Sequence, residues 1–332
     1  MLNAAVIGFG GIFKGSHLPG YKTLEEKGKV KLVAAYDISE AAFTKDVELN
    51  IATSDVSGYG DIRFYTDLEE MLQKEDIDLI DICIPTYLHK QYAIDMLDRG
   101  YLVLCEKPMA LSFEDCQEMV AASNGKLMIG QCLRFSPEYL YAKQLVTEGA
   151  YGKPTSASFR RLSPTPAWGF ENWFVDAKRS GGALLDLHIH DLDIARFIFG
   201  EPKKVSCVSG GKQVSEDAFA YSTLYYDDFA VFAEDRWDQV NMPFIADFRL
   251  SFEKANVVCT DGKVTVYPYE GEAFSPELSG DSMYMKEIEY LIDIFVKGEQ
   301  NVQNPPESAA QSIRLVETLR QSSREHGAIL DF

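Results

Sequence analysis

The first 130 residues alternate short apolar runs with stretches of helical periodicity, and this alternation limits the fold more than any other feature. The predicted strands are Ala4–Ile7, Lys31–Tyr36, Ile62–Tyr65, Leu79–Ile84, Leu102–Cys105 and Leu127–Gly130. Helices are predicted between them, near 12–27, 40–50, 67–74, 88–99 and 113–123. Strands that alternate with helices in this way predict a doubly wound parallel sheet, as in α/β proteins.

After Pro154 the pattern changes. One strongly helical stretch at 181–199 precedes six runs with strand-like alternation: Lys204–Ser209, Phe219–Tyr226, Ala230–Trp237, Ala246–Phe252, Ala255–Thr260 and Lys263–Tyr267. Two more helices are predicted near 283–297 and 306–325. These runs predict an open, mostly antiparallel sheet with one face packed on helices. A length of 332 residues suits about two domains, which we expect at 1–130, binding a nucleotide, and at 131–332.

The formal net charge of −19 excludes nucleic acid and anionic membrane surfaces as partners, because their phosphates would be repelled. No run approaches the ~18 apolar residues that a membrane span needs, and we expect no signal peptide in the first residues, whose apolar stretch is short and runs into glycines. The six cysteines form no CxxC pair, so we interpret them as small buried residues in a reducing compartment. The cytoplasm is therefore the expected location.

Three glycines follow the first predicted strand and open the first helix. Gly8 permits a tight turn, and Gly10 lets the backbone approach a pyrophosphate that sits on the helix N-terminus, beside Gly11 and Ile12. The third glycine of the usual fingerprint is replaced by Phe13. The position between strand and helix nevertheless indicates a dinucleotide site.

Asp37 ends the second predicted strand, where an acidic side chain accepts hydrogen bonds from the adenosine ribose hydroxyls. Its charge would repel a 2′-phosphate, and no Arg or Lys follows it directly, so NAD is favoured over NADP. The alternative is that Asp37 only caps a helix that starts near Ser39.

Glu106, Lys107 and Pro108 stand where the apolar run Leu102–Cys105 leaves the sheet. The carboxyl edge of a parallel sheet is where ligands bind in open α/β folds. Lys107 therefore either exchanges protons with a bound substrate or pairs with Glu106 as a strand cap.

The helical stretch at 181–200 is apolar over most of its surface but carries Asp186, His190 and Asp193 on one stripe. Burying three ionisable groups is costly unless they pair or face a site. His190 can move a proton near neutral pH, and Asp186 can orient it; a structural network is the alternative, above all for Asp193. His188 lies off the stripe and is interpreted as structural, and no metal site is expected.

Together, the Gly8/Gly10 turn, Glu106-Lys107-Pro108 and the Asp186…His190…Asp193 pattern resemble the Gfo/Idh/MocA oxidoreductases, which include glucose-fructose oxidoreductase and inositol dehydrogenases. The similarity extends over essentially the whole chain. It implies a Rossmann domain, then an α/β domain whose sheet face often forms dimers or tetramers. It also implies hydride transfer between a nicotinamide and a secondary alcohol of a sugar, cyclitol or glycoside.

The resemblance also implies roles for individual residues. Lys107 and His190 are the expected proton donors or acceptors, and Asp186 is the orienting acid. The expected cofactor contacts are Gly8, Gly10, Gly11, Ile12, Asp37, Pro85, Thr86, His89, Glu106 and Lys107. The expected substrate contacts are Lys107, Arg134, Asp186, His190, Trp168 and Trp173, although the two tryptophans suit ordinary packing equally well.

Three functions remain open at this point. The first is an NAD-dependent dehydrogenase acting on a small polyhydroxylated substrate. The second is a redox-neutral enzyme that oxidises a glycoside transiently and cleaves or rearranges it. The third is a non-catalytic, NAD-sensing regulator, which has no need of a proton-transfer set. Dense aromatic residues on the later strands predict a homodimer or tetramer through the second domain's sheet; they are Tyr221, Tyr225, Phe229, Phe232 and Trp237.

Overall fold

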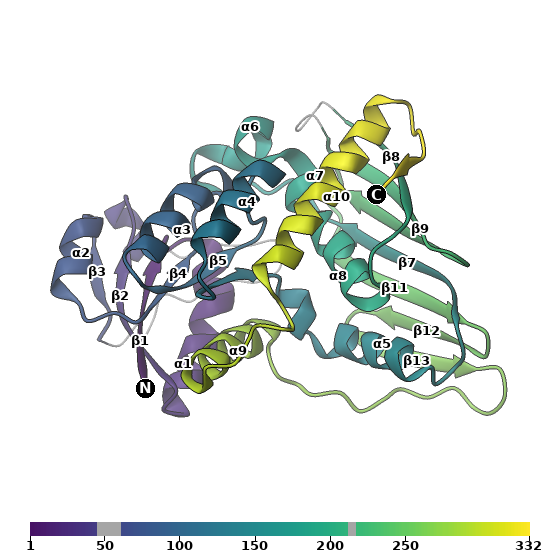
Figure 1. Cartoon of the computed structure of the whole chain (residues 1–332), viewed down its shortest axis with the longest axis horizontal. Helices are drawn as coiled ribbons and strands as arrows, with labels where there is room; N and C mark the ends of the chain where they lie inside the picture. The colour runs from purple at the N-terminus through teal and green to yellow at the C-terminus, as the bar shows by residue number, and fades with distance from the viewer. Residues whose placement is uncertain (45–60, 212–216) are drawn as a thin grey trace. The chain divides into compact units, whose positions relative to one another are not determined.

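The computed structural model describes residues 1–44, 61–211 and 217–332, which form two compact units (Figure 1). The first unit comprises Met1–Cys132, Ala167–Trp173 and Asp281–Ala310. The second comprises Leu133–Pro166, Phe174–Gly280 and Gln311–Phe332. The expected domains 1–130 and 131–332, with their separate roles, stay predictions.

A six-stranded parallel sheet forms the centre of the first unit, in the order β3-β2-β1-β4-β5-β6. Its strands are β1 (Leu2–Ile7), β2 (Val30–Tyr36), β3 (Arg63–Tyr65), β4 (Leu79–Ile82), β5 (Leu102–Glu106) and β6 (Leu127–Gly130). The strands β4, β5 and β6 are buried along their whole length, which explains their mostly apolar sequences, in which Asp81 and Glu106 are the charged residues. This strand order is that of the dinucleotide-binding fold, and the predicted doubly wound sheet is confirmed.

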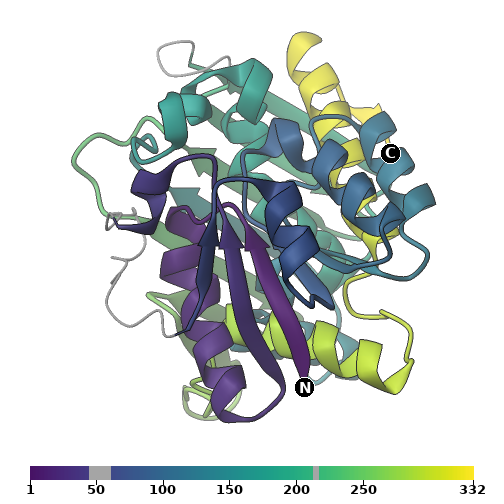
Figure 2. The same cartoon turned by 90° about the vertical axis from the view of Figure 1, so that its left-hand side faces the viewer.

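Helices cover both faces of this sheet (Figure 2). They are the π-helical turn η1 (Phe13–His17), α1 (Leu18–Glu26), η2 (Glu40–Phe43), α2 (Leu68–Lys74), η3 (Thr86–Leu88), α3 (His89–Asp98), α4 (Phe113–Ala122) and α9 (Met283–Lys297). Helix α9 packs on α1, whereas α3 packs on α4 and on β5. Of the helix predicted near 40–50, only η2 is seen, because residues 45–50 lie outside the described residues.

The second unit is built on an eight-stranded sheet in the order β13-β12-β11-β7-β10-β9-β8-β14. Its strands are β7 (Pro154–Leu162), β8 (Lys204–Gly210), β9 (Phe219–Tyr225), β10 (Ala230–Arg236), β11 (Ile245–Phe252), β12 (Ala255–Thr260), β13 (Lys263–Pro268) and β14 (Leu330–Asp331). All neighbours are antiparallel except β7 and β10, which run parallel. The predicted mostly antiparallel sheet is confirmed.

All but one of the remaining helices belong wholly or mainly to the second unit: η4 (Cys132–Phe135), α5 (Pro137–Glu148), α6 (Ala177–Ser180), α7 (Gly182–Asp186), α8 (Ile189–Phe199) and α10 (Pro306–Arg324). The exception is η5 (Phe170–Val175), which lies mainly in the first unit. Helices α7 and α8 pack on β7, β9 and β10, so they cover one face of the sheet (Figure 1). The opposite face carries exposed side chains that include Val208, Tyr221, Phe232 and Tyr267.

Trp237 is one of the aromatic residues from which assembly through the sheet is predicted, but its side chain is only 1% exposed, so including it there is wrong. Side chains alternate along a strand, and Phe232, Glu234 and Arg236 share one face of β10. Trp237 comes one residue after Arg236, so its side chain points to the opposite face of the sheet. There it packs edge-on against Phe174, with ring centres 6.0 Å apart.

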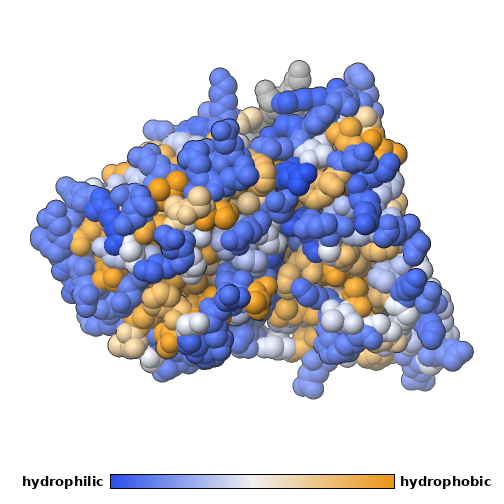
Figure 3. Space-filling model, in the orientation of Figure 1, coloured by the Kyte–Doolittle hydropathy of each residue, from blue (hydrophilic) through white to orange (hydrophobic). Residues whose placement is uncertain are grey.

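The six cysteines are all buried, as the sequence predicts. Among the described residues, no helix combines the length and the apolar character that crossing a membrane requires. The surface seen in Figure 3 is mostly hydrophilic, with apolar residues scattered in small groups.

Candidate functional site

The glycine turn after β1 has the geometry that the sequence predicts. Gly8 has a φ of +98°, and a Cβ at this position would lie 2.5 Å from the carbonyl oxygen of Cys83, so only glycine fits. At Gly10 no described atom lies within 4 Å of an added Cβ, which leaves the backbone open to a ligand. Gly11 and Ile12 then begin the helix that η1 continues.

Phe13 replaces the third glycine without disturbing this turn. Its side chain is fully buried, and its ring centre lies 5.3 Å from that of Phe9 and 6.1 Å from that of Tyr21. The ring of Phe13 projects from the π-helical turn η1 and packs against these two aromatic rings in the core. The departure from the fingerprint therefore does not close the space above Gly10.

Asp37 connects the end of β2 to the glycine turn. Its Oδ2 accepts the Phe9 backbone N–H at 3.0 Å, and its Oδ1 accepts the Ser39 N–H at 2.9 Å. Burial raises the pKa of this carboxyl, although both backbone donors oppose the change. A carboxylate has about four acceptor sites, so two remain for ribose hydroxyls. The capping role and the ribose role are thus compatible.

Glu106 and Lys107 lie at the carboxyl end of β5. Glu106 is buried, and its Oε2 accepts the backbone N–H of Lys107 at 3.0 Å, while the Lys107 side chain is half-buried. Burial alone would raise the pKa of Glu106, but the hydrogen bond and charge of His17, with the charge of Lys107, hold it below its ordinary value. Glu106 is therefore a buried anion that organises the backbone around Lys107.

His17 was not anticipated by sequence reasoning. It lies at the end of η1, fully buried, with Nδ1 2.8 Å from Asp81 Oδ2 and Nε2 2.9 Å from Glu106 Oε1. The available signal was Asp81, a charged residue inside the apolar strand β4. A charge in such a strand requires a buried partner.

The loop from Pro85 to His89 meets the lysine segment through His89. Its Nδ1 lies 2.8 Å from the Pro108 carbonyl oxygen, and its Nε2 lies 2.8 Å from that of Ile84. Burial lowers the pKa of His89. The predicted role of His89 as a cofactor contact stays a prediction; its ring holds two loops together. Thr86, also buried, has a hydroxyl with no hydrogen-bond partner among the described residues.

The single helix predicted over 181–199 is wrong. The chain forms two helices, α7 and α8, and the carbonyl of Ala183 accepts N–H bonds from both Leu187 and His188. The second of these bonds spans five residues, which widens the turn. Asp186 therefore ends α7, whereas His190 belongs to the first turn of α8.

Asp186 is buried and His190 is half-buried in the second unit. Their predicted catalytic roles stay predictions, as does the role of Lys107 in the first unit. His188 is fully buried, and its Nε2 lies 2.8 Å from Ser222 Oγ, which suits the structural role expected of it. Burial lowers its pKa to about 4, so the ring is neutral.

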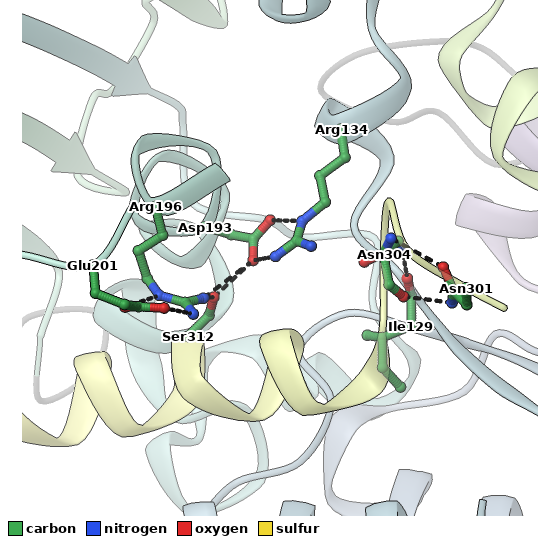
Figure 4. Close-up of polar contacts among 8 residues, drawn as sticks. All are labelled: Ile129, Arg134, Asp193, Arg196, Glu201, Asn301, Asn304 and Ser312. Carbon is green, nitrogen blue, oxygen red and sulfur yellow. Dashed lines mark hydrogen bonds and ion pairs between the residues drawn. The ribbon is translucent and has the colours of Figure 1, made fainter. Parts of the chain in front are cut away.

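Arg134 is engaged inside the second unit (Figure 4). Its Nε and one terminal nitrogen each donate to Asp193 at 2.7 Å, and both side chains are 2% exposed. Ser312 donates to the same carboxylate at 2.7 Å, and Arg196 contacts Ser312 and Glu201. Burial would raise the pKa of Asp193, but the charge of Arg134 lowers it. Asp193 is thus structural, and the substrate role of Arg134 stays a prediction.

The two tryptophans predicted to contact a sugar differ in exposure. Trp173 is buried at 8% exposed, which suits packing, whereas Trp168 is half-buried. Both belong to the segment Ala167–Trp173 of the first unit. Their contact with substrate stays a prediction.

The first unit fits NAD. The open backbone at Gly10 suits a pyrophosphate, the helix that starts at Gly11 offers its positive end, and Asp37 retains acceptor sites for a ribose. Gly8 supplies the turn that brings these parts together.

Comparisons with known proteins match both halves of the chain. Residues 2–129 match the oxidoreductase family with the NAD-binding Rossmann fold, and residues 139–264 match the GFO/IDH/MocA C-terminal domain. The chain is 34% identical over 158 residues to 2,7-anhydro-N-acetylneuraminate hydratase of Mediterraneibacter gnavus, covering 46% of this chain and 42% of that protein. It is 30% identical over 207 residues to D-glucoside 3-dehydrogenase of Escherichia coli, covering 60% of this chain and 55% of that protein.

The chain thus spans about half the length of these curated relatives. Among solved structures, levoglucosan dehydrogenase in complex with NADH has the same fold, with a TM-score of 0.84 at 18% identity over 99% of this chain and 98% of that one. The two family domains occur in tandem and together cover more than half of the sequence. The chain therefore belongs to the Gfo/Idh/MocA family of oxidoreductases.

Proposed function

We propose that this protein is an NAD-dependent dehydrogenase that transfers a hydride between the nicotinamide and a secondary alcohol of a sugar, cyclitol or glycoside. NAD, when bound, supplies the hydride acceptor. The chain supplies binding, orientation and proton transfer. Dehydrogenases of glucosides and inositols among the similar proteins support this substrate class.

The observation that carries the proposal is the placement of Lys107. It lies at the carboxyl edge of the parallel sheet, and the residues on both sides of it are held by buried histidines: Glu106 by His17 and Pro108 by His89. A structural surface lysine needs no such support. A half-buried amine fixed at this edge can take the proton from a substrate hydroxyl.

We assign two further roles to the second unit. His190 takes part in proton transfer at the substrate hydroxyl, since an imidazole changes charge near neutral pH. Asp186, which ends the helix before it, orients the substrate or the imidazole. A screen for NADH formation on polyols, sugars, cyclitols and glycosides tests the proposal.

Cofactor preference is expected to depend on Asp37. Replacing Asp37 with Ser and Ile38 with Arg removes the carboxylate that repels a 2′-phosphate and adds a guanidinium that pairs with it. The double variant should lose or invert the preference for NAD, measured as kcat/KM for NAD and NADP. Ile38→Met alone is the control, because Ile38 is 64% exposed and its apolar side chain does not set the preference. A wild-type preference for NADP would contradict the assignment.

A redox-neutral reaction is the second candidate. It is favoured by the relatives named 2,7-anhydro-N-acetylneuraminate hydratase, from Mediterraneibacter gnavus and from Escherichia coli. In such a reaction the substrate is oxidised transiently and reduced again, so product forms without net NADH. The same proton-transfer residues serve both reactions.

We also propose a homodimer, or a tetramer built from two dimers, joined through the open face of the second unit's sheet. Phe232 is 53% exposed and Tyr221 is 44% exposed on this face, and apolar groups of this size favour burial. Light scattering should give a multiple of the 37.2 kDa monomer mass, and Phe232→Arg should reduce it to the monomer. Val302→Arg, at an 80% exposed site in the first unit, is the matched control. A wild-type mass near 37.2 kDa would refute the assembly.

A further inference from the structure

A chain of buried polar contacts extends from β4 to the backbone of Lys107. Asp81 contacts Nδ1 of His17, Nε2 of His17 contacts one oxygen of Glu106, and the other Glu106 oxygen accepts the Lys107 N–H. The three heavy-atom distances are 2.8, 2.9 and 3.0 Å. His17 and Asp81 have no exposed surface, so water does not compete for these contacts.

The two carboxylates determine the protonation of His17. An ionised carboxylate is only an acceptor, so a ring placed between two of them must donate from both nitrogens. That arrangement requires the imidazolium form. Burial alone would lower the pKa of His17, but the charge and hydrogen bond of Asp81, with Cys83, raise it well above its ordinary value.

Other titratable groups also face this histidine. They are Asp81 and Cys83 from β4 and the residue after it, Glu106 from β5, Tyr21 from α1, and Tyr284 and Glu287 from α9. Glu287 is fully buried, with no hydrogen-bond partner for either oxygen among the described residues, and burial raises its pKa well above the ordinary value. Burial therefore favours the neutral form of Glu287, whereas Asp81 and Glu106 both contact the ring of His17.

Stability does not explain this arrangement. A buried charged triad contributes little net stability compared with apolar residues of the same volume. The triad does, however, fix the carboxylate that holds the backbone of Lys107. A misplacement of about 1 Å in a reacting group can cost about 10²-fold in rate.

We propose that His17 is a positioning residue, which as a cation between Asp81 and Glu106 fixes the Glu106 carboxylate and thereby places the amine of Lys107. The inference rests on the proposed proton-transfer role of Lys107. When His17 loses one proton, only one of the two carboxylates still has a ring N–H donor, so the ring no longer fixes Asp81 and Glu106 together. The Lys107 backbone then loses its anchor, although the fold and the glycine turn persist.

The protonation of His17 is measured directly by ¹⁵N NMR of the five histidines, with His17 assigned by its absence in His17→Gln. At about pH 8, where a free imidazole is neutral, both His17 nitrogens should carry protons. A neutral ring would overturn the proposal. So would a stoichiometric divalent cation in the purified protein, because His17, Asp81 and Cys83 are close enough to hold one, and Nδ1 would then be a ligand.

The functional test is Asp81→Asn, which keeps the shape but removes the charge that holds the second proton on His17. Without this charge the pKa of His17 falls, and above its pKa the protonated fraction of His17 drops about tenfold for each unit of pH. The kcat of Asp81→Asn should therefore fall at least about tenfold as the pH rises through neutrality. Wild type should lack this descending limb. NAD affinity, measured by calorimetry, should stay within a few-fold. Asp78→Asn is the matched control: it makes the same change just before β4, at an exposed carboxylate that accepts the Asn3 N–H.

The outcomes separate this inference from the proposed function. If wild type turns over no alcohol with NAD, the proposed function fails. If Lys107→Met retains activity, the proposed proton-transfer role of Lys107 fails. If Lys107→Met is inactive while Asp81→Asn follows the wild-type pH profile, only the positioning role of His17 fails. A loss of NAD binding in Asp81→Asn equal to its loss of kcat would also overturn it, because the effect would then be a general disturbance of the first unit.

Discussion

Lys107→Met should lose about 10²–10⁴-fold in kcat, which is the usual contribution of a general acid or base. Methionine has nearly the length of lysine but cannot exchange a proton. The backbone contacts on both sides of it, through Glu106 and Pro108, do not involve its amine. NAD affinity, measured by calorimetry, should therefore stay within a few-fold of wild type.

Lys126→Met is the control for this variant. It makes the same change at the opposite edge of the sheet, where the amine donates to the Gly100 carbonyl at 2.8 Å. Its turnover should equal that of wild type. Retention of more than about a tenth of wild-type kcat in Lys107→Met would exclude the proton-transfer role, given the usual size of such contributions.

Asp193→Ala should lower the free energy of unfolding by about 3–5 kcal/mol, measured by urea denaturation, because it leaves Arg134 as a buried charge without its counterion. The pKa of Asp193 is lowered in the folded state, so its contribution is present above the ordinary value of 3.8 and is lost as the pH falls below it. The difference between wild type and variant should therefore shrink in acid.

Two further variants make this prediction specific. Asp193→Leu combined with Arg134→Met removes both charges and should be less destabilised than Asp193→Ala. Asp228→Ala removes an ion pair with Lys153 in which both side chains are 76% exposed, and it should leave the denaturation midpoint unchanged. Equal effects of Asp193→Ala and Asp228→Ala would contradict a structural role for the buried pair.

The local sequence predicts most strands but not β7, which lies at the centre of the second sheet. Its sequence places Arg160 and Arg161 side by side, which obscures the alternation of a half-buried strand. Arg161 is buried because Asp191, thirty residues later, binds its guanidinium at 2.9 Å. A partner so distant in sequence cannot be inferred from local periodicity.

The candidate site shows the same limit. The spacing of Gly8, Gly10 and Asp37 after two predicted strands is enough to place them correctly, since strand ends determine their position. The contacts of Asp193 with Arg134 and of His17 with Glu106 join residues 59 and 89 positions apart, and they depend on tertiary packing. The break between α7 and α8 depends on two hydrogen bonds to one carbonyl, which an apolar periodic sequence does not reveal.

The central claim is that this chain oxidises a secondary alcohol with NAD. The direct measurement is NADH absorbance together with product quantification, for wild-type protein with NAD and each class of polyol, sugar, cyclitol and glycoside. We predict NADH in a one-to-one ratio with an oxidised product for at least one class. Product that forms without NADH, or NAD binding without turnover of any class, would contradict the claim, the first in favour of a redox-neutral enzyme and the second in favour of a regulator.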